Sequence, residues 1–123
     1  MVLLIVDGAN VVGSRPDGWW RDRLGAARRL RDALIPVAEA GLPGLAGPLE
    51  VVLVVEGRAA GLVAEPAPVP LRVVAARGSG DDEIVSLVRN ASGPTTVVTA
   101  DRGLRDRVRP LGAAVLGPRS LPY

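Results

Sequence analysis

The stretch Val2-Leu3-Leu4-Ile5-Val6-Asp7-Gly8-Ala9-Asn10 determines the fold class. Its first five residues form an unbroken apolar run, which is typical of a strand buried on both faces of a parallel sheet. The run ends in a carboxylate and an amide, Asp7 and Asn10. Because ligands bind at the carboxyl ends of strands in open α/β sheets, both side chains stand where site residues are expected. An Asx turn would use the same residue types, so this stretch alone leaves both interpretations open.

Alternating apolar segments continue this pattern along the chain. Helical patterns run from about Trp19 to Pro36, where the proline should kink or end the helix, and over 81–90 and 102–109. Asp17 and Ser79 are candidate helix caps. The alternation predicts an α/β fold with βαβ units and a parallel sheet of about five strands, in a single domain spanning residues 1–123. The further strands are expected at 51–55, 71–75, 95–99 and 113–116.

The composition excludes several kinds of chemistry. The chain has no Cys and no His, and all 15 of its basic residues are Arg. Disulfides, zinc–thiolate sites, catalytic triads, P-loops and Schiff-base lysines are therefore absent. Carboxylates, amides and hydroxyls remain, and such oxygen ligands suit hard cations such as Mg²⁺ or Mn²⁺. The net charge of +2 permits nucleic-acid binding without requiring it.

Acidic residues recur where strands end or helices begin. Asp7 follows the first strand, Glu56 the second and Asp101 the fourth, whereas Asp81 and Asp82 open the helix after the third. Carboxylates gathered on one sheet edge repel one another unless a cation neutralises them or they are well separated. Each also has a structural interpretation. Asp101 could be a helix N-cap, Asp81 and Asp82 could stabilise the helix dipole, and Glu56 could be a turn residue.

Three motifs resemble a known family. They are Val6-Asp7-Gly8-Ala9-Asn10, Ser79-Gly80-Asp81-Asp82-Glu83-Ile84 and Val97-Val98-Thr99-Ala100-Asp101-Arg102. In this order they resemble the YacP-like NYN branch of the PIN-domain nucleases, over nearly the whole chain. Two positions depart from the family pattern, since Glu56 stands where relatives commonly have Asp, and Gly80 stands where Ala is usual.

The resemblance implies a three-layer α/β/α PIN-like, Rossmann-like sandwich and a divalent-metal-dependent endoribonuclease. Asp7, Asp81 and Asp101 match the metal-binding acids, and Asn10 matches the amide that supports the first of them. These residues form the expected catalytic set. Asp82 and Glu56 are secondary metal ligands in this interpretation, and Mg²⁺ or Mn²⁺ is the implied cofactor.

Arginines and tryptophans near the first motifs suggest how RNA could bind. Arg15, Arg21 and Arg102 are candidate phosphate ligands, although a solvated basic face would look the same. Trp19 and Trp20 could stack on bases or pack against the core.

The expected partner is RNA, with the ribosome as a further candidate. We expect a monomer or weak homo-oligomer in the cytoplasm, with no membrane contact, because the N-terminal apolar run is too short for a signal peptide or span. The alternative function is a non-catalytic RNA-binding module on the same fold. A phosphatase is disfavoured, because Ala9 stands where its motif needs a second Asp.

Overall fold

The computed structural model describes all residues from 1 to 123, and its central element is a five-stranded sheet in the order β5-β4-β1-β6-β7. Every neighbouring pair in this sheet is parallel. The predicted α/β architecture and strand number are therefore confirmed. The strands are β1 (Val2–Asp7), β4 (Leu49–Val55), β5 (Leu71–Ala75), β6 (Thr95–Val98) and β7 (Ala114–Leu116).

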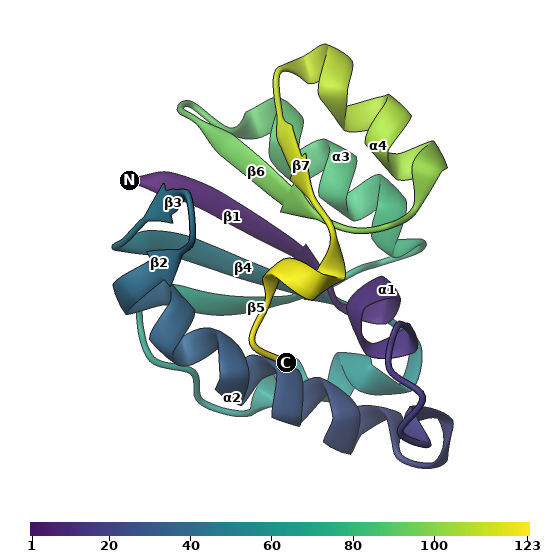
Figure 1. Cartoon of the computed structure of the whole chain (residues 1–123). Helices are drawn as coiled ribbons and strands as arrows, with labels where there is room; N and C mark the ends of the chain where they lie inside the picture. The colour runs from purple at the N-terminus through teal and green to yellow at the C-terminus, as the bar shows by residue number, and fades with distance from the viewer.

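Helices cover both faces of the sheet, which gives the predicted three layers (Figure 1). Two of them, α1 and α2, lie on one face, and α3 and α4 lie on the other. None of the helices is both long and apolar enough to cross a membrane. Their bounds are α1 (Gly8–Gly13), α2 (Arg23–Ala40), α3 (Gly80–Asn90) and α4 (Arg102–Val108).

Short elements complete the chain. Four 3₁₀ segments are η1 (Trp19–Arg21), η2 (Gly57–Ala64), η3 (Arg109–Leu111) and η4 (Pro118–Ser120). A two-stranded antiparallel ribbon, β2 (Gly41–Leu42) with β3 (Leu45–Ala46), occupies the Gly/Pro-rich connector after α2.

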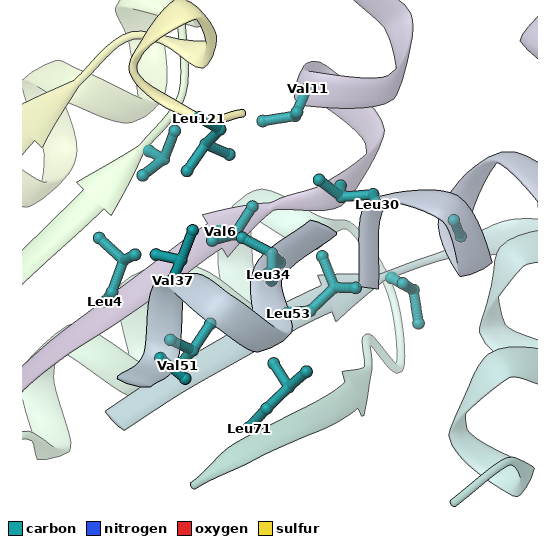
Figure 2. Packing of buried hydrophobic residues seen from close by; sticks show 14 of the residues in the cluster. Leu4, Val6, Val11, Leu30, Leu34, Val37, Val51, Leu53, Leu71 and Leu121 are labelled. Atoms are coloured by element: carbon teal, nitrogen blue, oxygen red, sulfur yellow. The ribbon is translucent and has the colours of Figure 1, made fainter. Parts of the chain in front are cut away.

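Side-chain alternation along the strands divides the core between the two faces. Leu4 and Val6 of β1 pack with α1 and α2, whereas Ile5 packs with α3 and α4. Figure 2 shows the first of these clusters, in which Leu30 and Leu34 of α2 lie over the sheet. The C-terminal segment returns to the same cluster through Leu121. Both faces of the central strand β1 are therefore buried from solvent, as its continuous apolar sequence predicts.

Two details of α2 differ from the sequence predictions. Pro36 does not end the helix, because α2 continues for one further turn to Ala40. Pro36 is exposed, so water can reach the carbonyl that its ring deprives of a donor, while Val37 and Ala38 remain buried against the core. The cap of α2 is Asp22 rather than Asp17, because η1 precedes the helix and the Asp22 carboxylate accepts from the Gly25 N–H at 2.9 Å.

An ion-pair cluster fastens η2 to α2. Glu65, directly after η2, accepts hydrogen bonds from Arg28 at 2.7 Å and from Arg31 at 3.0 Å. Hydrogen bonds from Arg28, and then those from Arg31, lower the pKa of Glu65 to about 2. Because folding depresses the pKa of Glu65, the ionised carboxylate stabilises the folded state. This stabilisation is fully present above the ordinary carboxyl pKa of 4.5 and is lost as the pH falls toward 2.

We therefore expect Glu65→Gln to destabilise the protein at pH 6, with the difference from wild type shrinking between pH 4.5 and pH 2. Thermal unfolding across this range measures the effect, and Glu39→Gln, an exposed position on α2, is the matched control. Equal stabilities of wild type and Glu65→Gln at pH 6 would show that the cluster contributes nothing.

Candidate active site

The carboxyl end of β1 carries the most deeply buried carboxylate of the molecule, Asp7, which is 6% exposed. Its strand is the centre of the sheet, with β4 on one side and β6 on the other. The chain leaves β1 toward β4 and later crosses to β6, so Asp7 lies at the topological switch point where ligands bind in open α/β folds.

Two hydrogen bonds hold the Asp7 carboxylate. Thr99, fully buried just beyond β6, donates its hydroxyl to Oδ2 at 2.9 Å. The Asn10 backbone N–H donates to Oδ1 at 3.3 Å, so Asp7 is the N-cap of α1. The predicted turn after β1 is thus a helical one. Each carboxylate oxygen has two lone pairs, so Asp7 retains capacity for a further ligand.

Asn10 supports this end of the sheet in a second way. Its side-chain Oδ1 accepts a hydrogen bond from the Ala100 N–H at 2.8 Å. The amide therefore holds the segment between β6 and Asp101, while the backbone of Asn10 supports Asp7.

Thr99 links two of the predicted site carboxylates. Besides donating to Asp7, its hydroxyl accepts from the backbone N–H of Asp101 at 3.1 Å. Asp101 in turn caps α4 by accepting from the Leu104 N–H at 2.9 Å. The cap interpretation of Asp101 is confirmed, and its second oxygen has no partner within the protein. Thr99 was not predicted as a site residue, because its only signal in the sequence is a hydroxyl two residues before Asp101.

Glu56 and Gly80, the two departures from the family pattern, are in contact. The Glu56 Oε2 accepts from the Gly80 N–H at 2.5 Å, which ties the end of β4 to the start of α3. A Cβ at position 80 would lie 3.0 Å from this oxygen, closer than an ordinary van der Waals contact. The longer acid is therefore matched by the smaller residue. The same bond places the first turn of α3, with Asp81, at the acidic edge.

Repulsion and burial act together on these acids. Burial raises the pKa of Asp7, the hydrogen bonds from Thr99 and Asn10 oppose this, and the charges of Asp81 and Glu56 raise it further. The pKa of Asp81 is also raised, first by burial and then by the charge of Asp101. Asp7, Glu56, Asp81 and Asp101 form no ion pair with any Arg. Like charges therefore act on Asp7 and Asp81 without a salt bridge to offset them.

Asp82 lies apart from this group in its contacts. Its carboxylate pairs with Arg107 of α4 at 2.9 Å, and this bond lowers the pKa of Asp82. The side chain is 73% exposed. Ser79 caps α3 as predicted, by accepting from the Asp82 N–H at 3.2 Å. In this structure Asp82 joins α3 to α4.

The donor set matches a hard divalent cation in kind, because it consists of carboxylate oxygens. The carboxylates are spaced more widely than the ligands of a preformed metal site, since no three Asp or Glu side chains are arranged to hold an ion. Asp81 has no hydrogen bond, and Asp101 has one free oxygen, so both can reorient by side-chain rotation.

Basic side chains border the acids on the β7 side. A cavity of about 550 Å³ is lined by Ser14, Arg15 and Arg119, together with Ala100 beside Asp101. Arg119 was not predicted; it follows β7 in the sequence and approaches Arg15 only through the fold. Of the other predicted RNA ligands, Arg21 lies against the exposed Trp20 ring at 5.9 Å, and Arg102 is the exposed first residue of α4.

Two crystal structures of Rae1 (YacP) from Bacillus subtilis, one of them of a mutant, share this fold. Their TM-scores are 0.76 and 0.74, with 19% and 20% identity over 98% of this chain and 71% and 72% of theirs. No family model matches the sequence, and no curated protein matches it. The YacP-like, PIN-like architecture is therefore confirmed at the level of the fold.

We expect Thr99→Val to lower the free energy of unfolding by about 1–3 kcal/mol, because it leaves the buried Asp7 oxygen and the Asp101 N–H without their partner. Chemical denaturation measures the loss. Thr96→Val is the matched control, since Thr96 is buried on β6, three residues before Thr99, and its hydroxyl has no protein partner. Equal effects of the two substitutions would contradict a linking role for the Thr99 hydroxyl.

Proposed function

We propose that the protein is a divalent-metal-dependent endoribonuclease. The observation that carries this proposal is that Asp7, Asp81 and Asp101 lie along the same edge of the sheet, close enough for like charges to raise the pKa of Asp7 and Asp81, and that none of them forms a salt bridge with an Arg. Such an arrangement costs stability in the absence of a cation. The likeness to Rae1 (YacP) and the three sequence motifs support the same function.

Asp7, Asp81 and Asp101 are the residues proposed to hold Mg²⁺ or Mn²⁺. A divalent ion bound there would lower the pKa of a water molecule and neutralise the charge of a phosphodiester. Thr99 and Asn10 fix the position of the Asp7 carboxylate and of the segment bearing Asp101.

Glu56 and Asp82 remain secondary ligands in this proposal. One oxygen of Glu56 is engaged by the Gly80 N–H, and Asp82 is paired with Arg107. Each side chain is thus held by one oxygen and has the other available for an ion.

RNA is the proposed substrate because positive charge lies next to the acids. Arg15 and Arg119 line a cavity that borders Ala100, so phosphates on either side of the cleaved bond can be held there. Arg21 and Arg102 are exposed and extend the basic surface. We also propose that the protein acts in the cytoplasm, as a monomer or weak homo-oligomer. The ribosome is a further proposed partner.

A non-catalytic RNA-binding module on the same fold is the second candidate. The spacing of the carboxylates favours it, because no three of them are arranged to hold an ion. In that case the acids would act as helix caps and interhelical links, and the arginines alone would bind RNA.

Single-stranded RNA incubated with the protein and Mn²⁺ should be cleaved, and a chelator should stop the reaction. Asp7→Asn and Asp101→Asn should each lower the cleavage rate by at least about 100-fold, because each removes a charged ligand. Asp106→Asn, an exposed acid on α4, is the matched control and should cleave at the wild-type rate. RNA binding by wild type without cleavage, at any divalent concentration, would leave only the binding module.

Unfolding of the metal-free variants separates a site role from a structural one. Asp7→Asn removes a buried charge whose pKa is raised, so its free energy of unfolding at pH 7 should equal or exceed that of wild type. Asn also keeps a good helix cap at positions 7 and 101. A large loss of stability in both variants would favour the structural role.

A further inference from the structure

A second cavity, of about 310 Å³, opens on the β4 side of the acidic edge. Its walls include Gly8 and Ala9, which directly follow Asp7, and Glu56, which follows β4. We propose that this cavity binds one unstacked nucleobase of a single-stranded RNA, next to the phosphate held at the acids. The inference rests on the proposed function and adds to it a subsite for a base.

Trp19 and Arg23 supply a stacking surface in this cavity. The Trp19 ring is half-buried and packs against the core cluster on the α1 and α2 face of the sheet. The Arg23 guanidinium carbon lies 5.2 Å from the centre of that ring, and both side chains line the cavity. Aromatic rings and guanidinium planes are the surfaces on which proteins stack unpaired bases.

Trp20 differs from its neighbour in burial and in position. It is 55% exposed, does not line the cavity and meets Trp19 edge-on at 87°. The two tryptophans therefore have separate roles, and Trp20 provides a matched control for Trp19.

Polar groups in the cavity suit the edge of a base. Glu56 lends one oxygen to the Gly80 N–H and keeps Oε1 without a protein donor. A carboxylate oxygen in that position accepts from the ring N–H or amino group of a base. The volume lies at the lower end of the range for small-molecule sites, which fits one base rather than a stack.

The position of the cavity distinguishes a nucleobase from an unrelated apolar ligand. The base cavity is lined by Gly8 and Ala9, directly after Asp7, and the basic cavity of Arg15 and Arg119 is lined by Ala100, directly before Asp101. A strand with one base against Trp19 would therefore pass its backbone over the acids toward the arginines. One cavity thus offers a surface for stacking a base, and the other offers arginines for binding a phosphate. A single-stranded nucleic acid carries both of these groups.

Tryptophan fluorescence tests the proposal directly. The chain has two tryptophans, so Trp20→Phe leaves Trp19 as the only one. In a Trp20→Phe, Asp101→Asn background with Mg²⁺, a short RNA oligonucleotide should quench Trp19 emission. An abasic oligonucleotide of equal length and charge should not. RNA binding, measured by anisotropy of a labelled oligonucleotide, with unchanged Trp19 emission would overturn the proposal.

Affinity measurements provide the second test. Trp19→Leu should weaken binding of the RNA oligonucleotide by about 5- to 150-fold, whereas Trp20→Leu should change it less than about 3-fold. Because Trp19 also packs against the core, Gly78→Leu is the second variant. Gly78 lines the cavity, and a Cβ there would meet no atom within 4 Å. Wild-type affinity in both Trp19→Leu and Gly78→Leu would overturn the proposal.

The outcome is distinguishable from failure of the proposed function. Quenching of Trp19 by RNA in a protein that never cleaves it would support the base subsite and contradict the nuclease. Metal-dependent cleavage with no response of Trp19 to bases would support the nuclease and contradict the subsite.

Discussion

The Asp7 carboxylate is buried at the end of the central strand, and its surroundings are arranged to keep an ionisable group there. Thr99 and the Asn10 backbone donate hydrogen bonds to it, and Asn10 holds the segment that leads to Asp101. Glu56 brings the start of α3, with Asp81, to the same edge. Burial and like charges still raise the pKa of Asp7 despite these donors. The folded chain therefore favours a proton or a cation at this position, and the absence of Lys and His leaves no basic partner except Arg.

Helix capping and metal binding are compatible at this edge. Asp7 caps α1 and Asp101 caps α4, each through one backbone N–H. A structural interpretation of each acid is correct by itself, yet it does not explain why Asp81 lies half-buried beside them without a hydrogen bond. Capping accounts for individual hydrogen bonds, whereas the proposed cation would account for the shared location of the acids and would offset their mutual repulsion. The two cavities beside α1 give the same edge a basic side and an aromatic side.

Local sequence patterns predicted the elements that depend on local physics. The branched run of β1 and the acids after three of the strands predicted the parallel sheet and the acidic edge, because strand polarity alone brings those ends together. Contacts between distant segments were not predictable in this way. Thr99 reaches Asp7 across 92 positions, and Glu56 reaches Gly80 across 24. The helix does not end at Pro36, because tertiary burial of Val37 and Ala38 outweighs one lost hydrogen bond. The helix α1 was missed because its six residues carry too short a periodic pattern.

A crystal soaked in Mn²⁺ tests the central claim most directly, because the anomalous signal locates the ion without reference to activity. We expect one strong anomalous peak between the carboxylates of Asp7, Asp81 and Asp101, with Asp81 and Asp101 reoriented toward it, and no such peak in Asp7→Asn. Peaks found only elsewhere on the surface, with these three carboxylates unchanged, would contradict a metal centre and leave the acids as caps of α1 and α4.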